Sequence, residues 1–198
     1  KGGAAHHLTT QHEIETGLHR NDSSSSWRYM KMACGENARR IYKMTRFDEA
    51  WDFRRTFSAD RDLKNKQDAF CDSAKAFTLL HGSGSVPSTL ADAEFPDDLE
   101  LEAVVALLRG KVKLNTHCYT QVDFESFIRH SNEFQFPVAA FHHAHESYLV
   151  PDLLKQTYGN VTPAIAIFST NANYKLESYF GSPFAGAILA SHNITPIY

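Results

Sequence analysis

Histidine side chains end two apolar segments of the sequence, and their type and position could support metal chemistry. His117 closes the segment 112–117, and His142 and His143 close the segment that starts at 137. A neutral imidazole is a good ligand for zinc and related divalent ions. A zinc ion with one open position lowers the pKa of its bound water towards neutrality. His117 and His143 are therefore a candidate metal-binding pair. By periodicity His142 is an equal candidate, because adjacent strand residues point to opposite faces.

The elements that must position these histidines form a strand–helix–strand unit. Apolar and polar residues alternate over 112–117 as in a strand, and 137–141 is continuously apolar, as in a strand buried on both faces. Between them, residues 121–134 carry apolar side chains at roughly helical spacing. Strands joined by such a crossover run parallel. Because ligands bind at the carboxyl ends of parallel strands, His117 and His143 are expected to project into one cavity.

The alternation of strands and helices extends over the rest of the chain. Further strands are expected at 27–33, 163–168 and 194–198, and helices at 48–80, 97–110, 147–157 and 174–191. This pattern predicts an α/β domain with a parallel sheet, which fits either a barrel or an open doubly wound sheet. The absence of a Gly-rich dinucleotide fingerprint weighs against the doubly wound sheet. Residues 1–26 are polar and are expected to form a loop or disordered segment, which leaves 27–198 as the domain.

Two consequences of this pattern can be checked in a structure. The four strands from residue 112 onwards should be parallel and adjacent in sequence order. The helix 48–80 should turn Phe57, Phe70 and Phe77 inward, because they belong to its apolar stripe and charged residues fill the other face.

Composition excludes several classes of protein. The 198 residues are 42% hydrophobic and 22% charged, which is ordinary for one globular domain. A net charge of −3 gives no indication of nucleic-acid binding. No apolar run approaches the roughly 20 residues of a membrane span. The expected partner is a small-molecule substrate, and a homo-oligomer is compatible with this composition.

The cysteines and the glycosylation sequons say little about compartment. The cysteines are Cys34, Cys71 and Cys118. They form no CxxC pair, so neither a cysteine-rich zinc site nor a dense disulfide framework is expected. Sequons at Asn21, Asn160 and Asn193 fit an extracellular protein, and nothing in the sequence excludes a cytoplasmic one.

Four segments together resemble a known family. Residues 111–134, KVKLNTHCYTQVDFESFIRHSNEF, and 137–154, PVAAFHHAHESYLVPDLL, are similar to strands five and six of the amidohydrolase superfamily, with their helices. The likeness is to its fungal branch, described as carbohydrate-esterase-type or imidazolonepropionase-like. MKMACGENARRIY at 30–42 and FRRTFSADRDLKNKQDAFC at 53–71 resemble the segments before strand five. The resemblance covers most of 27–198. It implies a partial TIM (β/α)8 barrel with strands from about four to eight, lacking strand one and the end of strand eight.

The resemblance also implies a function. Family members are metal-dependent hydrolases that cleave an amide, cyclic amide, N-acetyl or ester bond with a metal-activated water, and zinc is the expected ion. On this pattern His117 is the strand-five ligand and His143 the strand-six ligand, with His142 as the fallback. The middle-strand ligand is Glu36 or a carbamylated Lys31, with Glu36 slightly favoured.

Two further residues are expected to contact the substrate. Tyr174 and Lys175 follow the strand at 163–168 and should face the same mouth as the histidines. The alternative is that they are surface residues that begin the next helix.

The sequence departs from the family at two ligand positions. No strand-one pair of histidines is identified, and the chain reaches Tyr198 before any position for the strand-eight Asp, the expected general base. The chain by itself is therefore expected to be incomplete and inactive. The alternative is a non-catalytic α/β binding module, or an inactive fragment, with structural histidines. A Ser-dependent or Cys-dependent hydrolase is disfavoured, because there is no GxSxG elbow.

Overall fold

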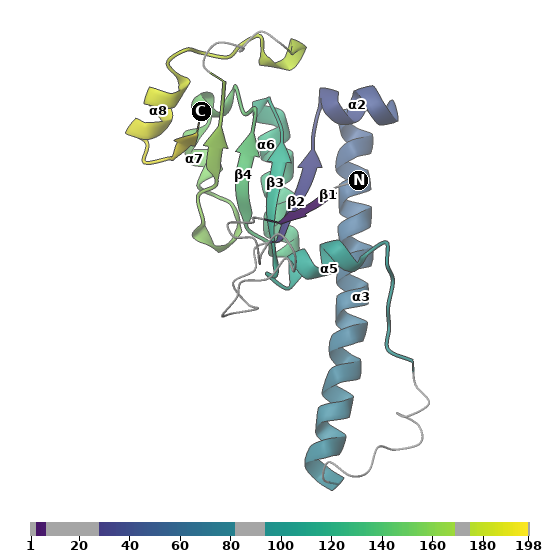
Figure 1. Ribbon diagram of the computed structural model, residues 1–198. Helices are drawn as coiled ribbons and strands as arrows, with labels where there is room; N and C mark the ends of the chain where they lie inside the picture. Colours follow the sequence, from purple (N-terminus) through teal and green to yellow (C-terminus); the bar gives the residue numbers. More distant parts are fainter. Residues whose placement is uncertain (1–2, 7–27, 82–93, 169–174, 198) are drawn as a thin grey trace.

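A mixed sheet forms the centre of the molecule in the computed structural model, which describes residues 3–6, 28–81, 94–168 and 175–197 (Figure 1). Its strands are β1 (Gly3–His6), β2 (Arg28–Ala33), β3 (Val112–His117), β4 (Val138–His142), β5 (Ala164–Ala166) and β6 (Pro196–Ile197). They lie in sequence order, and β2 to β6 are parallel. The prediction of parallel strands adjacent in sequence order from residue 112 onwards is thus confirmed.

Strand β1 departs from the prediction for the start of the chain. Residues Gly3–His6 pair antiparallel with β2, although they lie in the stretch 1–26 for which the sequence predicts a loop. The polar composition of that stretch gives no sign of a strand, although the backbone of these four residues pairs with β2. Residues 7–27 lie outside the described part of the chain.

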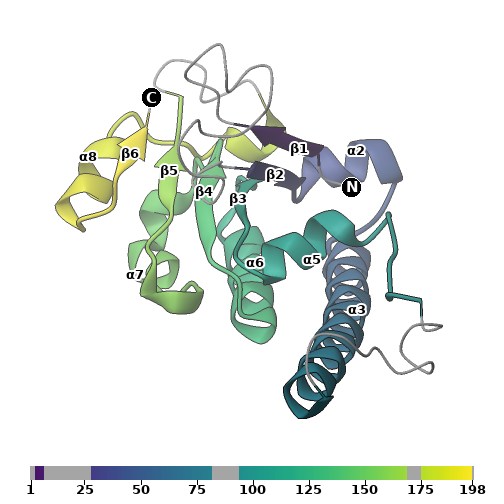
Figure 2. The same cartoon turned by 60° about the horizontal axis from the view of Figure 1, so that its bottom comes forward.

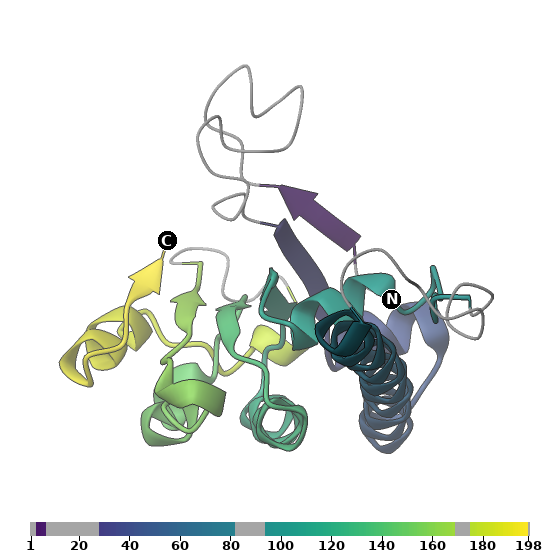
Figure 3. The same cartoon turned by 90° about the horizontal axis from the view of Figure 1, so that it is seen from below.

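The helices cover one face of the parallel strands. The four that contribute are α3 (Arg46–His81), α6 (Gln121–Phe134), α7 (Pro151–Leu154) and α8 (Ala185–Ser191). Figure 3 shows them on the same side of the row of strands. The core lies between the two layers and includes Leu114, Phe127 and Phe141, each at most 1% exposed. Coverage of one face distinguishes this arrangement from a doubly wound sheet, which carries helices on both faces.

Helix α3 confirms the prediction of a long helix at 48–80. It runs for 36 residues, and its carboxyl-terminal half extends beyond the sheet (Figure 1). Phe57 is 1% exposed and stacks on Phe136 with ring centroids 4.8 Å apart. Phe70 and Phe77 are only half-buried, because they lie on the part of the helix that leaves the sheet. Helix α5 (Glu102–Leu108) lies beside α3 (Figure 2). Arg109, which follows α5, pairs with Asp68 of α3.

Three predicted helices are shorter or broken. The helix expected at 97–110 is α5 alone, and the one at 147–157 is divided into η2 (Ser147–Leu149), α7 and η3 (Tyr158–Asn160). The one at 174–191 becomes η4 (Leu176–Ser178) and α8. Pro151 lacks a backbone donor and starts a new helix at its first position. Gly181 and Pro183 likewise fall between η4 and α8.

Asp60 on α3 gives a stability prediction. Its side chain is fully buried, and neither carboxylate oxygen has a hydrogen-bond partner in the described structure. Burial, with a smaller contribution from Asp98, raises the pKa of Asp60 to about 7. The folded state therefore keeps this proton longer than the unfolded state. The preference of the folded state for protonated Asp60 therefore stabilises the protein at low pH, in full below the unfolded pKa. This stabilisation is lost as pH rises through about 7.

We therefore expect Asp60→Asn to stabilise the protein at pH 8 and to have little effect near pH 4. A gain of about 1–3 kcal/mol is expected, since each unit of pKa corresponds to about 1.4 kcal/mol and relaxation removes part of the cost. Calorimetric melting temperatures at both pH values would measure it, with the exposed Asp62→Asn as the matched control. A gain of equal size at both pH values would contradict this account.

Candidate functional site

A bulge in β4 sets the positions of the candidate histidines. The register between β3 and β4 shifts after the Leu114–Val138 pair, so that Asn115 faces Ala140 and His117 faces His142. Without this extra residue the large apolar Phe141 would stand beside His117. The bulge therefore places His142 beside His117 on the same face of the sheet, where their ring centroids are 4.9 Å apart.

His143 also reaches His117, although it follows His142 directly. Strand β4 ends at His142, and His143 has a φ of 56°, in the left-handed region. Strand alternation no longer applies after such a turn. The His143 ring consequently lies 4.8 Å from that of His117, centroid to centroid. The structure brings both alternative partners to His117 and does not choose between them.

The histidines open onto a cavity of about 1150 Å³. It runs from the carboxyl ends of β2 and β3 to the helices α2 (Glu36–Tyr42), α3 and α5. The residues that line its histidine end are Lys31, His117, Tyr119, His143, His145, Phe168 and Lys175. His117 and His143 thus project into the same cavity, as expected from the sequence.

The imidazoles are neutral at physiological pH. Burial, with smaller contributions from His143, His142 and Lys31, lowers the pKa of His117 to about 4. Burial also lowers the pKa of His143 to about 4, with smaller contributions from neighbouring histidines, Lys31 and Lys175. The pKa of His142 is lowered by burial and by Lys31. Neutral rings keep the nitrogen lone pair that a metal ligand requires.

Lys31 and Glu36, the two alternatives for a middle-strand ligand, lie in different places. Lys31 is on β2, where it pairs with Asn115, and it lines the cavity. Glu36 is the first residue of α2 and does not line the cavity. Its backbone N–H donates to Glu177, and one of its carboxylate oxygens is buried without a described partner. Of the two alternatives, only Lys31 lines the cavity that His117 and His143 also line.

The described residues do not by themselves form a metal site. Within the ranges that the structure covers, no three His, Cys, Asp or Glu side chains are placed to hold an ion together. His117 with His142 or His143 is a two-nitrogen set, and a structural or catalytic zinc site has at least three protein ligands.

The two predicted substrate contacts have different outcomes. Tyr174 lies outside the described residues. Lys175 lines the cavity, and its ammonium group donates to the Asn37 side-chain oxygen at 3.4 Å. Sequence reasoning missed Asn37, because only the fold brings α2 beside the segment before η4.

An aromatic wall that the sequence did not reveal flanks the histidines. Tyr119 stacks on His143 and on His145, with centroids 5.7 and 6.1 Å apart. Phe168 packs on His143 at 4.7 Å. The Glu146 N–H donates to the Tyr119 carbonyl, and the Gln121 N–H donates to the Glu146 carboxylate, each at 3.0 Å. These bonds fix the loops after β3 and β4 relative to each other.

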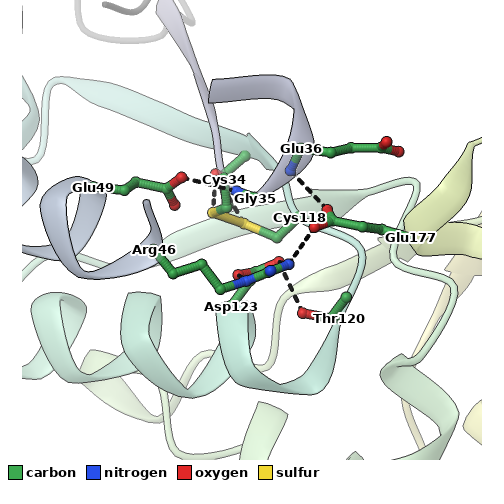
Figure 4. Close-up of a disulfide and its surroundings, with 10 residues drawn as sticks. Cys34, Gly35, Glu36, Arg46, Glu49, Cys118, Thr120, Asp123 and Glu177 are labelled. Carbon is green, nitrogen blue, oxygen red and sulfur yellow. Dashed lines mark hydrogen bonds and ion pairs between the residues drawn. A yellow bond between two sulfur atoms is a disulfide. The ribbon is translucent and has the colours of Figure 1, made fainter. Parts of the chain in front are cut away.

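A disulfide joins the two strands behind the site (Figure 4). Cys34 follows β2 and Cys118 follows β3, and the bond spans a sequence separation of 84 residues. The Cys34 N–H also donates to the His117 carbonyl at 2.9 Å. The strand that carries Lys31 is thus fastened to the strand that carries His117.

Charged side chains surround Gly35 beside this disulfide. Arg46 bridges Asp123 and Glu177, and the Gly35 N–H donates to Glu49 at 2.9 Å (Figure 4). A Cβ on Gly35 would lie 2.5 Å from a Glu177 oxygen and 2.7 Å from an Asp123 oxygen, and its φ is +63°. Glycine is therefore required there. Burial, then Asp123, raises the pKa of Glu49 to about 8.

No helix in the described part of the chain combines the length and the apolar character needed to cross a bilayer.

Comparison with known proteins identifies related chains. No model of a known protein family matches the sequence. The curated protein "Amidohydrolase tasK" of Hapsidospora irregularis is 48% identical over 183 residues, which cover 89% of this chain but 18% of that protein. The chain therefore spans about a fifth of the length of this relative. The amidohydrolase from Thermotoga maritima MSB8 shares the fold with a TM-score of 0.58 and 22% identity, over 85% of this chain and 40% of the other. The chain belongs to the amidohydrolase superfamily, as a segment that matches part of each longer relative.

Proposed function

We propose that this chain contributes part of the active site of a metal-dependent hydrolase that cleaves an amide, cyclic amide, N-acetyl or ester bond. The observation that carries the proposal is the pairing of neutral imidazoles at the carboxyl ends of adjacent parallel strands, with ring centroids 4.8 Å apart. The names of both relatives describe amidohydrolases, which supports this reaction class.

The ligand set of the proposal is His117 with His143, and His142 is the fallback. Lys31, in carbamylated form, is the preferred third ligand, because it shares the cavity with the histidines and Glu36 does not. A divalent ion, most simply zinc, would lower the pKa of a water there and make it a nucleophile at neutral pH. This chain's own residues orient the ligands through the bonds of the Tyr119 and Glu146 loops.

The proposed architecture is a partial TIM barrel in which β2 to β6 are strands four to eight. Five parallel strands with helices on one face support this assignment. The antiparallel β1 occupies the edge of β2 where a barrel would place its preceding strand. On this assignment the described residues lack a complete ligand set, so the isolated chain is expected to be inactive.

The test is metal dependence of the full-length protein. We expect hydrolysis of an N-acetyl or cyclic amide substrate to stop after chelation and to return on addition of zinc, with metal content measured in parallel. A second candidate is a non-catalytic metal-binding or structural module, favoured by the incomplete ligand set. Full activity in chelator would refute the metal-dependent hydrolase, and bound metal without turnover would support the second candidate.

A further inference from the structure

Three polar side chains from separate elements meet in the cavity. Asn37 comes from α2, Tyr119 follows β3, and Lys175 precedes η4, and all three line the same space as the histidines. The Lys175 ammonium donates to the Asn37 oxygen at 3.4 Å, and the Asn37 side chain also hydrogen-bonds Tyr119. From this convergence we propose that Lys175, Asn37 and Tyr119 form a subsite for a carboxylate group of the substrate. The proposal rests on the proposed hydrolase function and names its substrate class, a carboxylate-bearing amide or ester.

Donors remain free in this group of side chains. A lysine ammonium has three N–H donors, of which one is used by Asn37. The Asn37 amide contacts both the Lys175 ammonium and the Tyr119 hydroxyl. The ammonium and the phenol can each donate a hydrogen bond to a carboxylate, and hydrogen bonds to an ionised acceptor are the stronger kind.

The charge of the cavity also favours an anion. Its described lining carries four cationic side chains against two carboxylates: Lys31, Arg40, Arg55 and Lys175 against Asp52 and Glu100. Asp52 is paired with Arg55. The nearby Glu177 is bound to Arg46 and to the Glu36 N–H, and it does not neutralise Lys175. Within the described part of the chain, Lys175 forms no ion pair.

The surroundings indicate the rest of the substrate. Tyr119 is 4% exposed, and its ring continues the aromatic wall formed with His143 and Phe168. Such a wall suits a flat, apolar group next to the anionic end. One ammonium assisted by neutral donors matches a single negative charge better than a phosphate dianion, which recruits arginine clusters or helix termini.

Direct binding to the full-length protein tests the subsite, with benzoate and the isosteric neutral benzamide as probes. We expect wild-type protein to bind benzoate about tenfold more tightly than benzamide, because only benzoate pairs with the ammonium. Lys175→Met should abolish this preference by weakening benzoate binding about tenfold relative to benzamide, and Lys175→Arg should retain it. Lys75→Met, at an exposed position on α3, is the matched control.

Calorimetric titration in chelator separates this proposal from the hydrolase itself, since binding needs neither metal nor turnover. Equal affinity of wild-type protein for the two probes would overturn the subsite, as would unchanged benzoate preference in Lys175→Met. Tighter binding of phenyl phosphate than of benzoate would overturn the carboxylate assignment. If Lys175→Met also loses benzamide, Asn37→Asp provides the second variant, because an added carboxylate next to Lys175 should remove the benzoate preference.

Discussion

Replacing His117 by Ala in the full-length protein is expected to reduce hydrolysis at least about 100-fold and to lower bound metal in parallel. Loss of an outer-shell partner alone costs about 10–100-fold in metal affinity or activity, and His117 is proposed to be a direct ligand. His117 is also the residue that both other histidines approach, at 4.9 Å for His142 and 4.8 Å for His143. Without His117, the rings of His142 and His143 are left 6.4 Å apart.

The same measurement distinguishes the two possible partners. The stronger loss of metal in His143→Ala or in His142→Ala identifies the second ligand, since their rings are 6.4 Å apart and only one needs to face the ion. His192→Ala, at a partly exposed position after α8, is the control and should retain metal and activity. Unchanged metal content in His117→Ala would refute the assignment of the whole group.

The sheet and its two best-defined helices follow from patterns that extend over many residues. Residues 121–134 repeat apolar side chains at helical spacing, and α6 has these same bounds. The apolar residues of α3 recur over 36 residues, and the helix could be predicted for the same reason. Alternating strands and crossovers restrict the sheet order, because consecutive parallel strands usually neighbour each other.

Local backbone events were not predictable from such patterns. The bulge in β4 depends on how Ala139 and Ala140 fit against β3, and two alanines give no signal of it. The left-handed turn at His143 occurs at a residue type that only modestly favours that region. These two features decide which histidines face His117. The sequence could therefore indicate the right strand ends but not the arrangement of the rings.

The supporting residues of the site were hidden for another reason. Lys175 and Asn37 are separated by 138 residues and meet only because η4 returns over α2. Lys31 and Glu36 lie on either side of Ala33, where β2 ends, yet only Lys31 belongs to the strand and lines the cavity. Their separation depends on where β2 ends and α2 begins.

Removing the Cys34–Cys118 disulfide, by reduction or by the double substitution to Ser, is expected to destabilise the sheet by about 2–5 kcal/mol. The bond closes a loop with a sequence separation of 84 residues, and the chain-entropy account assigns about 4.5 kcal/mol to a loop of that length. Both cysteines are buried, so the two thiols or serine hydroxyls left behind would not gain contacts with solvent. The backbone bond from Cys34 to His117 would remain and would keep β2 and β3 paired.

Calorimetry with and without a thiol reductant measures this loss as a fall of roughly 4–20 °C in melting temperature, since 1 kcal/mol corresponds to about 2–4 °C in a domain of this size. The double variant should melt at the temperature of the reduced wild-type protein and should not respond to reductant. Cys71→Ser is the matched control, because this cysteine is exposed and free on α3. A change in melting temperature on reduction of the double variant, or no change in the wild type, would contradict a stabilising role for the disulfide. With the bond intact, Lys31 and His117 stand on strands that cannot separate, which keeps the mouth of the cavity in place for the chemistry proposed there.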